Sequence, residues 1–149
     1  MGSYNTYPEL VNAIDAALPA IMEGPIADWV KDVLQTTIEV YVYDPKKFPP
    51  SSRYHRRGEN GGLLDKSLMV ANYDPKYREL TVYSDAEGTY KQAGMRLDKM
   101  VENGGPFTWG GNAARRRPFY DKAEEEYLSL DGPRHGMEEM IVAELEKVL

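Results

Sequence analysis

The sequence contains no cysteine, and this absence excludes several kinds of chemistry at once. Disulfide bonds, thiolate zinc sites and cysteine nucleophiles all need a sulfur atom that the chain does not have. Histidine is almost as scarce, since His55 and His135 are the only two. Neither stands at metal-ligand spacing from another ligand, so we expect neither a zinc enzyme nor a bound metal.

Long apolar runs are missing as well. No uninterrupted run approaches the roughly 20 residues that cross a bilayer, and the chain opens on polar sequence instead of a signal peptide. We therefore expect a soluble, unexported protein that makes no membrane contact. Its 149 residues show no break in composition, which predicts a single domain over 1–149.

Motifs for nucleotide or acyl chemistry are also absent. There is no Gly-x-Ser-x-Gly elbow, no phosphate loop and no dinucleotide fingerprint. The glycine-rich stretch from Gly104 to Gly111 lacks the lysine and the preceding strand that a phosphate loop needs. We expect no cofactor.

Carboxylates raise one catalytic alternative. Asp121, Glu124 and Glu125 fall on neighbouring positions of one predicted helical turn, where they offer a divalent-ion site or the acid–base pair of a hydrolase. Their position early in a helix favours a structural role, because acidic side chains there interact favourably with the helix dipole. We therefore expect a protein that is not an enzyme.

The negative charge is confined to one part of the chain. The net charge is −6, and residues 120–149 carry nine acids and three bases, so all of the excess lies there. Two segments before them are basic. The first has five bases and no acid, and the second is a run of three arginines: Lys46, Lys47, Arg53, Arg56 and Arg57, then Arg115, Arg116 and Arg117.

Two interpretations of this charge pattern stay open. In the first, the charged residues simply form solvated faces that keep the protein in solution. Alternatively, opposite patches attract successive copies of the chain head to tail in a ring, where they set the register of the contact. The first basic segment, Lys46 to Arg57, lies within a stretch at about 44–62, where many prolines and glycines predict a long loop. A loop of this length in a compact domain is typically functional or disordered.

Aromatic residues are the next distinctive feature. The chain has eleven tyrosines, whose rings and hydroxyl groups suit wet protein–protein contacts as well as the cover of a small core. Phe107 and Trp109 stand between pairs of glycines. Rings on such a loop need a cover, which is either the protein's own core or a pocket in a neighbouring copy.

The N-terminal part of the sequence predicts two helices. Thr6 is placed to cap the first, with Pro8 in its first turn and Glu9 completing a capping box. Pro19 is expected to kink or end this helix. Helical periodicity resumes from Ile26 to about Tyr43, although residues 36–43 are β-branched and aromatic enough to form a strand instead.

A β-hairpin is predicted in the middle of the chain. Residues 67–73 and 78–84 alternate in polarity, and Asp74-Pro75-Lys76-Tyr77 between them is typical of a turn. The alternation places one pair of apolar residues on one face of the first strand and another pair on one face of the second: Leu68 and Val70, then Leu80 and Val82.

Helices are predicted again towards the C-terminus. Arg96 to Glu102 favours a short helical piece, with Leu97, Met100 and Val101 facing inwards. Asp131-Gly132-Pro133 then separates two longer helices, whose inward faces are marked by Phe119, Ala123, Tyr127 and Leu130 and by Met137, Met140, Ile141, Leu145 and Val148. The predicted fold class is α+β, with N-terminal and C-terminal helices packed on a small antiparallel β-sheet.

Four short elements follow one another along the chain. They are Arg57-Gly58, Gly62-Leu63-Leu64-Asp65-Lys66-Ser67, Val101-Glu102-Asn103-Gly104-Gly105, and Ala114-Arg115-Arg116-Arg117-Pro118-Phe119 leading into Asp121-Lys122-Ala123. Together with the helices and the hairpin, the order of these elements resembles a known family, the small tail-completion and head–tail joining proteins of long-tailed phages. The chain differs from the family pattern at Pro106 to Asn112, which is an insertion, and in its heavier arginine run.

This resemblance implies a structural virion protein, a minor tail component of a bacteriophage that is made in the host cytoplasm. Its expected role is to form an oligomeric ring at the neck, with copies of itself, portal-side adaptors and tail tube or tail terminator proteins as partners. DNA would pass through the ring without sequence-specific binding. The resemblance implies no catalytic residues.

Contact with partners is expected at the two basic segments and at the Phe107/Trp109 loop. The alternative function is a small nucleic-acid-binding regulator that uses the same basic segments, because arginines neutralise phosphates and release counterions.

Overall fold

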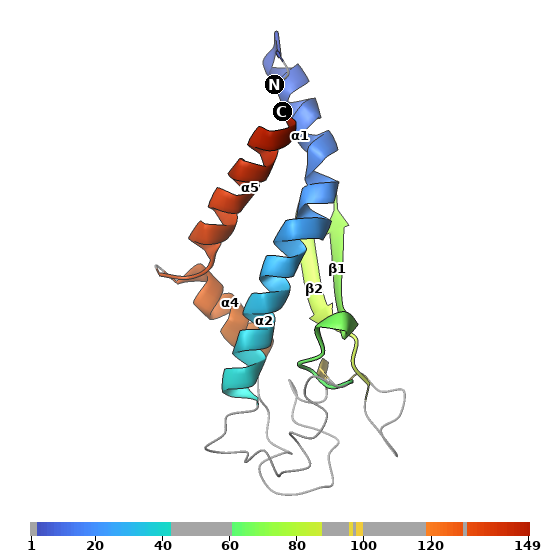
Figure 1. The fold of residues 1–149 in the computed structure, drawn as a ribbon, viewed down its shortest axis with the longest axis vertical. Helices are drawn as coiled ribbons and strands as arrows, with labels where there is room; N and C mark the ends of the chain where they lie inside the picture. The colour runs from blue at the N-terminus through green and yellow to red at the C-terminus, as the bar shows by residue number, and fades with distance from the viewer. Residues whose placement is uncertain (1–2, 43–60, 88–95, 97, 100–118, 130) are drawn as a thin grey trace, which may run out of the picture.

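A computed structural model of the chain describes residues 3–42, 61–87, 96, 98–99, 119–129 and 131–149. Its central feature is a long helical rod built from three consecutive pieces (Figure 1). These are helix α1 (Tyr7–Ile21), the π-helix η1 (Met22–Ile26) and helix α2 (Ala27–Tyr41).

A hairpin and a pair of helices flank this rod on either side (Figure 1). A short 3₁₀ helix, η2 (Lys66–Leu68), leads into the hairpin of β1 (Met69–Asp74) and β2 (Glu79–Ser84), and the helices are α4 (Phe119–Leu128) and α5 (Arg134–Val148). The predicted α+β class, with helices around a small antiparallel sheet, is confirmed.

Helix α1 begins where the sequence predicts. The side chain of Thr6 accepts a hydrogen bond from the backbone N–H of Glu9 at 3.3 Å, which satisfies one of the free donors of the first turn. Glu9 Oε2 accepts from the N–H of Asn5 at 2.9 Å. In the expected capping box Glu9 would accept from the N–H of Thr6, whereas here it accepts from the N–H of the preceding residue.

Pro19 does not end α1, contrary to the expectation from the sequence. The helix continues to Ile21, and the N–H of Met22 bonds to the carbonyls of Leu18 and Pro19. The backbone leaves helical geometry at Gly24, with φ −101° and ψ −107°. Gly24 precedes Pro25, and the ring of a proline disfavours helical geometry in the residue before it. The bend in the rod therefore belongs to Gly24-Pro25.

The ambiguous stretch at the end of α2 is helical. Ile38 and Val42 are one turn apart and both are fully buried, so this face of a helix is covered by the rest of the fold. Thr37 Oγ1 donates to the carbonyl of Val33 at 2.9 Å, a bond that turns a β-branched residue back onto its own helix.

The hairpin is confirmed, but its first strand is displaced from the prediction. Ser67 and Leu68 belong to η2, and β1 begins at Met69. The antiparallel register pairs Met69 with Ser84, Ala71 with Val82, and Tyr73 with Leu80. Because neighbouring residues of a strand face opposite ways, Val70 points away from the face that carries Leu80 and Val82.

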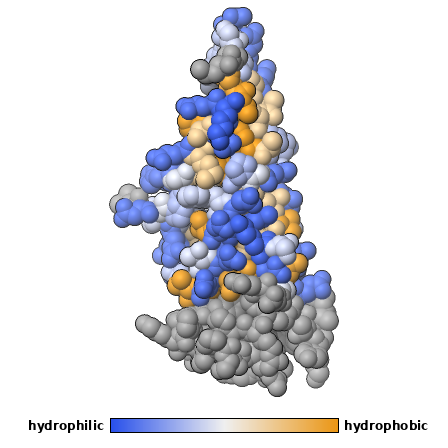
Figure 2. All heavy atoms as spheres, in the orientation of Figure 1, coloured by the Kyte–Doolittle hydropathy of each residue, from blue (hydrophilic) through white to orange (hydrophobic). Residues whose placement is uncertain are grey.

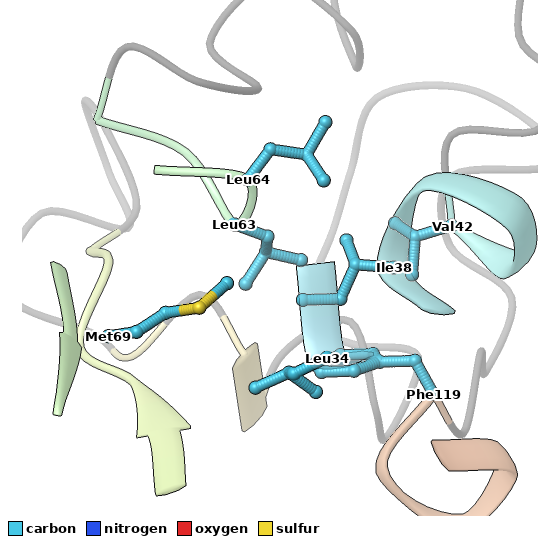
Figure 3. Close-up of a cluster of buried hydrophobic side chains, with 7 residues drawn as sticks. All are labelled: Leu34, Ile38, Val42, Leu63, Leu64, Met69 and Phe119. Carbon is cyan, nitrogen blue, oxygen red and sulfur yellow. The ribbon is translucent and has the colours of Figure 1, made fainter. Parts of the chain in front are cut away.

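Two apolar clusters lie along the rod. The first joins the end of α2, the turn before η2, β1 and the start of α4, and Figure 3 shows the ring of Phe119 beside Leu34 and Ile38. The second is centred on Ile21, Met22 and Ile26 and includes residues of both strands and of α5. The hairpin therefore contributes to both clusters, while α4 covers the rod near the end of α2 and α5 covers it around its middle.

Most of the predicted inward-facing residues of the C-terminal helices do pack inwards, and Leu130 lies outside the described residues. Phe119 and Ala123 join the first cluster, and Met137, Met140, Ile141 and Leu145 join the second. Val148 is 62% exposed, so its predicted place on the inward face is wrong.

The short helix predicted from Arg96 is partly borne out. Asp98 and Lys99 are helical, whereas Arg96 forms an antiparallel β-bridge with Glu87. Leu97, Met100 and Val101 lie outside the described residues, as does most of the loop predicted at 44–62. Its last residues, Gly61 and Gly62, form the turn that leads to η2.

One helix in the described part of the chain has the length and composition of a membrane span. It runs from Tyr7 to Tyr41 over 35 residues, and its most apolar 18-residue window has a mean hydropathy of 1.2 and is 22% buried. Core helices of folded domains meet the same criteria. Here both apolar clusters pack against this helix.

Gly132 offers a direct test of how closely the chain is packed between α4 and α5. A Cβ at this position would lie 2.2 Å from the carbonyl oxygen of Glu126 and 2.6 Å from that of Tyr127. We expect Gly132→Ala to lower the free energy of unfolding by about 1–3 kcal/mol, because backbone must move to relieve the clash. Urea denaturation measures this. The neighbouring change Asp131→Ala, at an exposed side chain, is the control, and equal stability of the two variants would contradict the prediction.

Candidate interaction surfaces

All ten predicted contact residues lie outside the described part of the chain, so their role stays a prediction. They belong to segments 43–60 and 100–118, and they are Lys46, Lys47, Arg53, Arg56, Arg57, Phe107, Trp109, Arg115, Arg116 and Arg117.

The residues that flank these two segments nevertheless come together in one place. Val42 precedes the first segment and Leu63 follows it closely, and both pack in the same cluster as Phe119, which follows the second segment. Figure 1 places this cluster towards the end of the rod opposite the start of α1 and the end of α5. Both basic segments are therefore attached at the same end of the fold.

A buried carboxylate fixes the second attachment point. Asp98 is fully buried and accepts from Arg96 Nε at 3.0 Å, from Arg96 Nη2, from its neighbour's N–H and from Tyr120 Oη at 2.7 Å. The hydroxyl of Tyr120 also accepts from the N–H of Ser84 at 3.0 Å. This network, which we call the Asp98 clamp, ties the start of α4 to the end of β2.

The electrostatics of the clamp suit a structural role. Arg96 stacks over the ring of Tyr83, with its guanidinium carbon 4.5 Å from the ring centroid, and its hydrogen bonds to Asp98 raise the pKa of Arg96 further. Burial, together with the hydrogen bond to Asp98, raises the pKa of Tyr120 far above its ordinary value. The Tyr120 hydroxyl therefore keeps its proton and acts as a hydrogen-bond donor.

Sequence reasoning did not find this clamp. It placed Arg96 in a helix and gave Asp98 no role, because the partners Ser84 and Tyr120 are far from Asp98 in the sequence. The available signal was an aspartate set among the apolar residues Leu97, Met100 and Val101. A charged residue in such surroundings is typically paired when it is buried.

The family-like element from Gly62 to Ser67 forms a turn docked on α2. Asp65 organises it by accepting from the N–H of Gly61 at 2.9 Å and from the hydroxyl of Ser67 at 2.6 Å, and these bonds lower the pKa of Asp65. Gln35 Nε2 on α2 donates to the carbonyl of Leu64 at 2.7 Å. This element thus has an architectural role, holding the chain where the first basic segment ends.

The tip of the hairpin is held against α1 by an ion pair. Arg78 has a left-handed backbone with φ 48°, which a side chain other than glycine's disfavours. Its guanidinium donates to both carboxylate oxygens of Asp15, at 2.8 and 2.9 Å. This bidentate contact lowers the pKa of Asp15 and offsets part of the backbone strain.

The carboxylates weighed as a catalytic site do not converge on one point. Across the described residues no group of three or more acids and histidines could hold a metal ion. Glu125 pairs with Lys122 on its own helix at 3.3 Å, and Glu124 is exposed. These side chains form a solvated helix face.

Several large apolar side chains of the described part lie at its surface, among charged residues (Figure 2). The most exposed are Tyr7 at 79% and Tyr77 at 66%, and Val142 on α5 is 54% exposed. Exposed tyrosine rings are enriched in protein contacts because they combine apolar area with a hydroxyl group.

Comparison with known proteins assigns no family, since no family model, curated protein or solved structure matches the chain.

Tyr120 allows the clamp to be tested with a matched control on the same helix. Tyr120→Phe leaves the N–H of Ser84 and one oxygen of buried Asp98 without the hydroxyl that joins them. We expect it to lower the free energy of unfolding by about 1–3 kcal/mol. Tyr127→Phe removes only a bond to the sulfur of Met137 at 3.2 Å and should cost less. Equal losses in denaturant titrations would contradict a structural clamp.

The Asp15–Arg78 pair predicts a particular dependence on pH. The pKa of Asp15 in the folded protein lies below its ordinary value of 3.8. Its contribution to stability is therefore present above about pH 4 and is lost as the pH falls through the lowered pKa. We expect Asp15→Asn to be less stable than the parent at neutral pH and to approach it as the solution is acidified. Unfolding midpoints across this range measure the effect. In an Arg78→Ala background the same substitution should show no such convergence.

Proposed function

We propose that this chain is a structural assembly subunit, a tail-completion or head–tail joining protein that forms a ring at the neck of a long-tailed phage. The family resemblance of its sequence supplies the virion context. The observation that carries the assembly role is that basic and acidic residues belong to different parts of the fold. The basic segments are attached at one end, and the acidic excess lies on the C-terminal helices, of which α5 extends towards the other end.

This arrangement favours contacts between copies, because a molecule with unlike ends is complementary to the next one in line. Head-to-tail contacts of this kind close into rings when the rotation between copies permits. Opposite charges at the two ends steer the encounter and exclude wrong registers.

The attachment of the basic segments also supports a contact role. Phe119 is fully buried at the end of one segment, and the Asp98 clamp fixes the chain before it. Val42 and Leu63 hold the two sides of the other. Binding residues are frequently carried on loops that a rigid scaffold positions.

The buried polar groups support a non-catalytic protein. Within the described residues the largest buried polar network is the Asp98 clamp, and its hydrogen bonds join structural elements to one another. The Tyr120 hydroxyl is kept protonated by burial and by Asp98, so it is a poor base.

Reconstitution with other neck components tests the proposal. The purified chain is sedimented alone and with portal-side adaptor and tail tube proteins of the same phage, and particles are then examined for its presence. We expect it to enter a complex and to be found in the neck. Combined substitution of Arg53, Arg56 and Arg57 by Ala should reduce entry, whereas substitution of Lys31, Lys76 and Lys147 by Ala should reduce it less.

Two results would count against an assembly subunit. One is a chain that stays monomeric in every mixture and never enters particles. The other is tight binding to DNA whose affinity falls steeply with salt, which would favour the nucleic-acid-binding regulator instead.

A further inference from the structure

The outward face of α5 carries a shallow open groove of about 330 Å³. Its floor is apolar and its rim is acidic: Val142 and Ala143 form the floor, with Glu138, Glu139 and Glu146 around it. Val142 is 54% exposed, although it lies at the middle of a helix whose opposite face is packed in the second cluster. This is an apolar strip that the described fold leaves uncovered.

Two of the three rim acids form no ion pair with the described part of the chain, and the third forms only a long one. The nearest cation to Glu138 is Arg134 on the same helix, with Nε 3.7 Å from Oε1, which is too long for a good hydrogen bond. Glu139 and Glu146 form no ion pair with any described residue. The groove therefore presents negative charge that the described residues compensate only in part, around an apolar centre.

We propose that this groove seats the basic segment Lys46–Arg57 of a second copy of the chain, so that copies join head to tail through α5. The inference rests on the proposed assembly function and names the surface that carries it.

The chemistry of the two surfaces is complementary. Segment 46–57 has five bases and no acid. Lysine and arginine side chains have long apolar stems that can lie on Val142 and Ala143 while their charged groups reach the rim glutamates. A contact that used the carboxylates alone would leave the apolar floor in water.

The position of the two surfaces favours a second copy over the same molecule. The residues that hold segment 46–57 in place pack around Phe119, towards one end of the rod. The second half of α5, with the groove, lies towards the other end (Figure 1). A contact between opposite ends of successive copies is heterologous, and such contacts can repeat around a ring.

Charge reversal in the groove tests the proposal. The groove variant combines Glu138→Lys, Glu139→Lys and Glu146→Lys. The control variant makes the same change in net charge at exposed acids on other surfaces, with Glu39→Lys, Glu124→Lys and Asp131→Lys. Circular dichroism and urea midpoints establish that both variants fold. Sedimentation velocity at low and moderate salt then gives the dissociation constant of self-association.

We expect the groove variant to bind itself more weakly than the parent by on the order of tenfold or more, and the control to change much less. Self-association of the parent should weaken as salt is added, because screening acts on the charges at the rim.

Mixing two variants gives a second measurement of association, and a positive result in it cannot arise from misfolded protein. The base variant combines Arg53→Glu, Arg56→Glu and Arg57→Glu. When the groove variant is alone, its positive groove repels the basic segment of the next copy. When the base variant is alone, its acidic segment repels the negative groove of the next copy. In an equimolar mixture every junction between alternating variants is complementary again. We therefore expect the mixture to restore association that neither variant shows by itself.

Three results would overturn this inference. They are a parent chain that stays monomeric at high concentration and low salt, a groove variant that associates as tightly as the control, and a mixture that fails to recover. A monomer at all concentrations would indicate that the groove is covered from within the same chain or by another protein.

The outcome is separable from that of the proposed function. If the groove variant still self-associates and enters necks normally, the inference fails and the assembly role stands. If self-association depends on the groove but the chain is never found in particles, the neck assignment fails and the contact stands.

Discussion

The packing around Phe119 is the contact on which the rest of the fold depends. Its ring is fully buried where the end of α2, the turn before η2 and β1 meet α4. Burying a side chain of this size stabilises the folded state by roughly 1.5–3 kcal/mol, which is a large fraction of the stability of a small domain. Without it, four segments that are distant in the sequence would have no common anchor.

Hydrogen bonds around this apolar cluster fix how the elements are oriented relative to one another. The Asp98 clamp joins α4 to the end of β2, and the bonds of Asp65 and Gln35 hold the preceding turn on α2. Both are close to places where a basic segment leaves or rejoins the described fold. These hydrogen bonds fix the structure of one end of the fold, whereas the acidic helix α5 extends towards the other end.

Local signals in the sequence were enough to predict much of this architecture. Thr6 marks the start of α1 correctly, and alternating polarity locates the hairpin. The predicted inward face of the first strand was wrong. Asp65 caps a 3₁₀ turn that removes Leu68 from β1, so the residues that face Leu80 and Val82 are shifted by one position from those predicted.

Local sequence signals did not predict the position of the helix bend or the contacts between residues far apart in the sequence. Pro19 reads as a breaker, yet α1 continues through it and the bend falls at Gly24. The clamp joins Asp98 to Ser84 and Tyr120, whose proximity arises only when the helices and the hairpin pack. The predicted contact residues of segments 43–60 and 100–118 lie outside the described structure, and their role stands as a prediction.

Gly24 lies at the middle of the rod, within the second apolar cluster between Met22 and Ile26, so its backbone angles set how one half of the rod is inclined to the other. In a head-to-tail assembly that inclination would contribute to the rotation from each copy to the next, and this rotation determines whether the series closes into a ring or continues as an open helix.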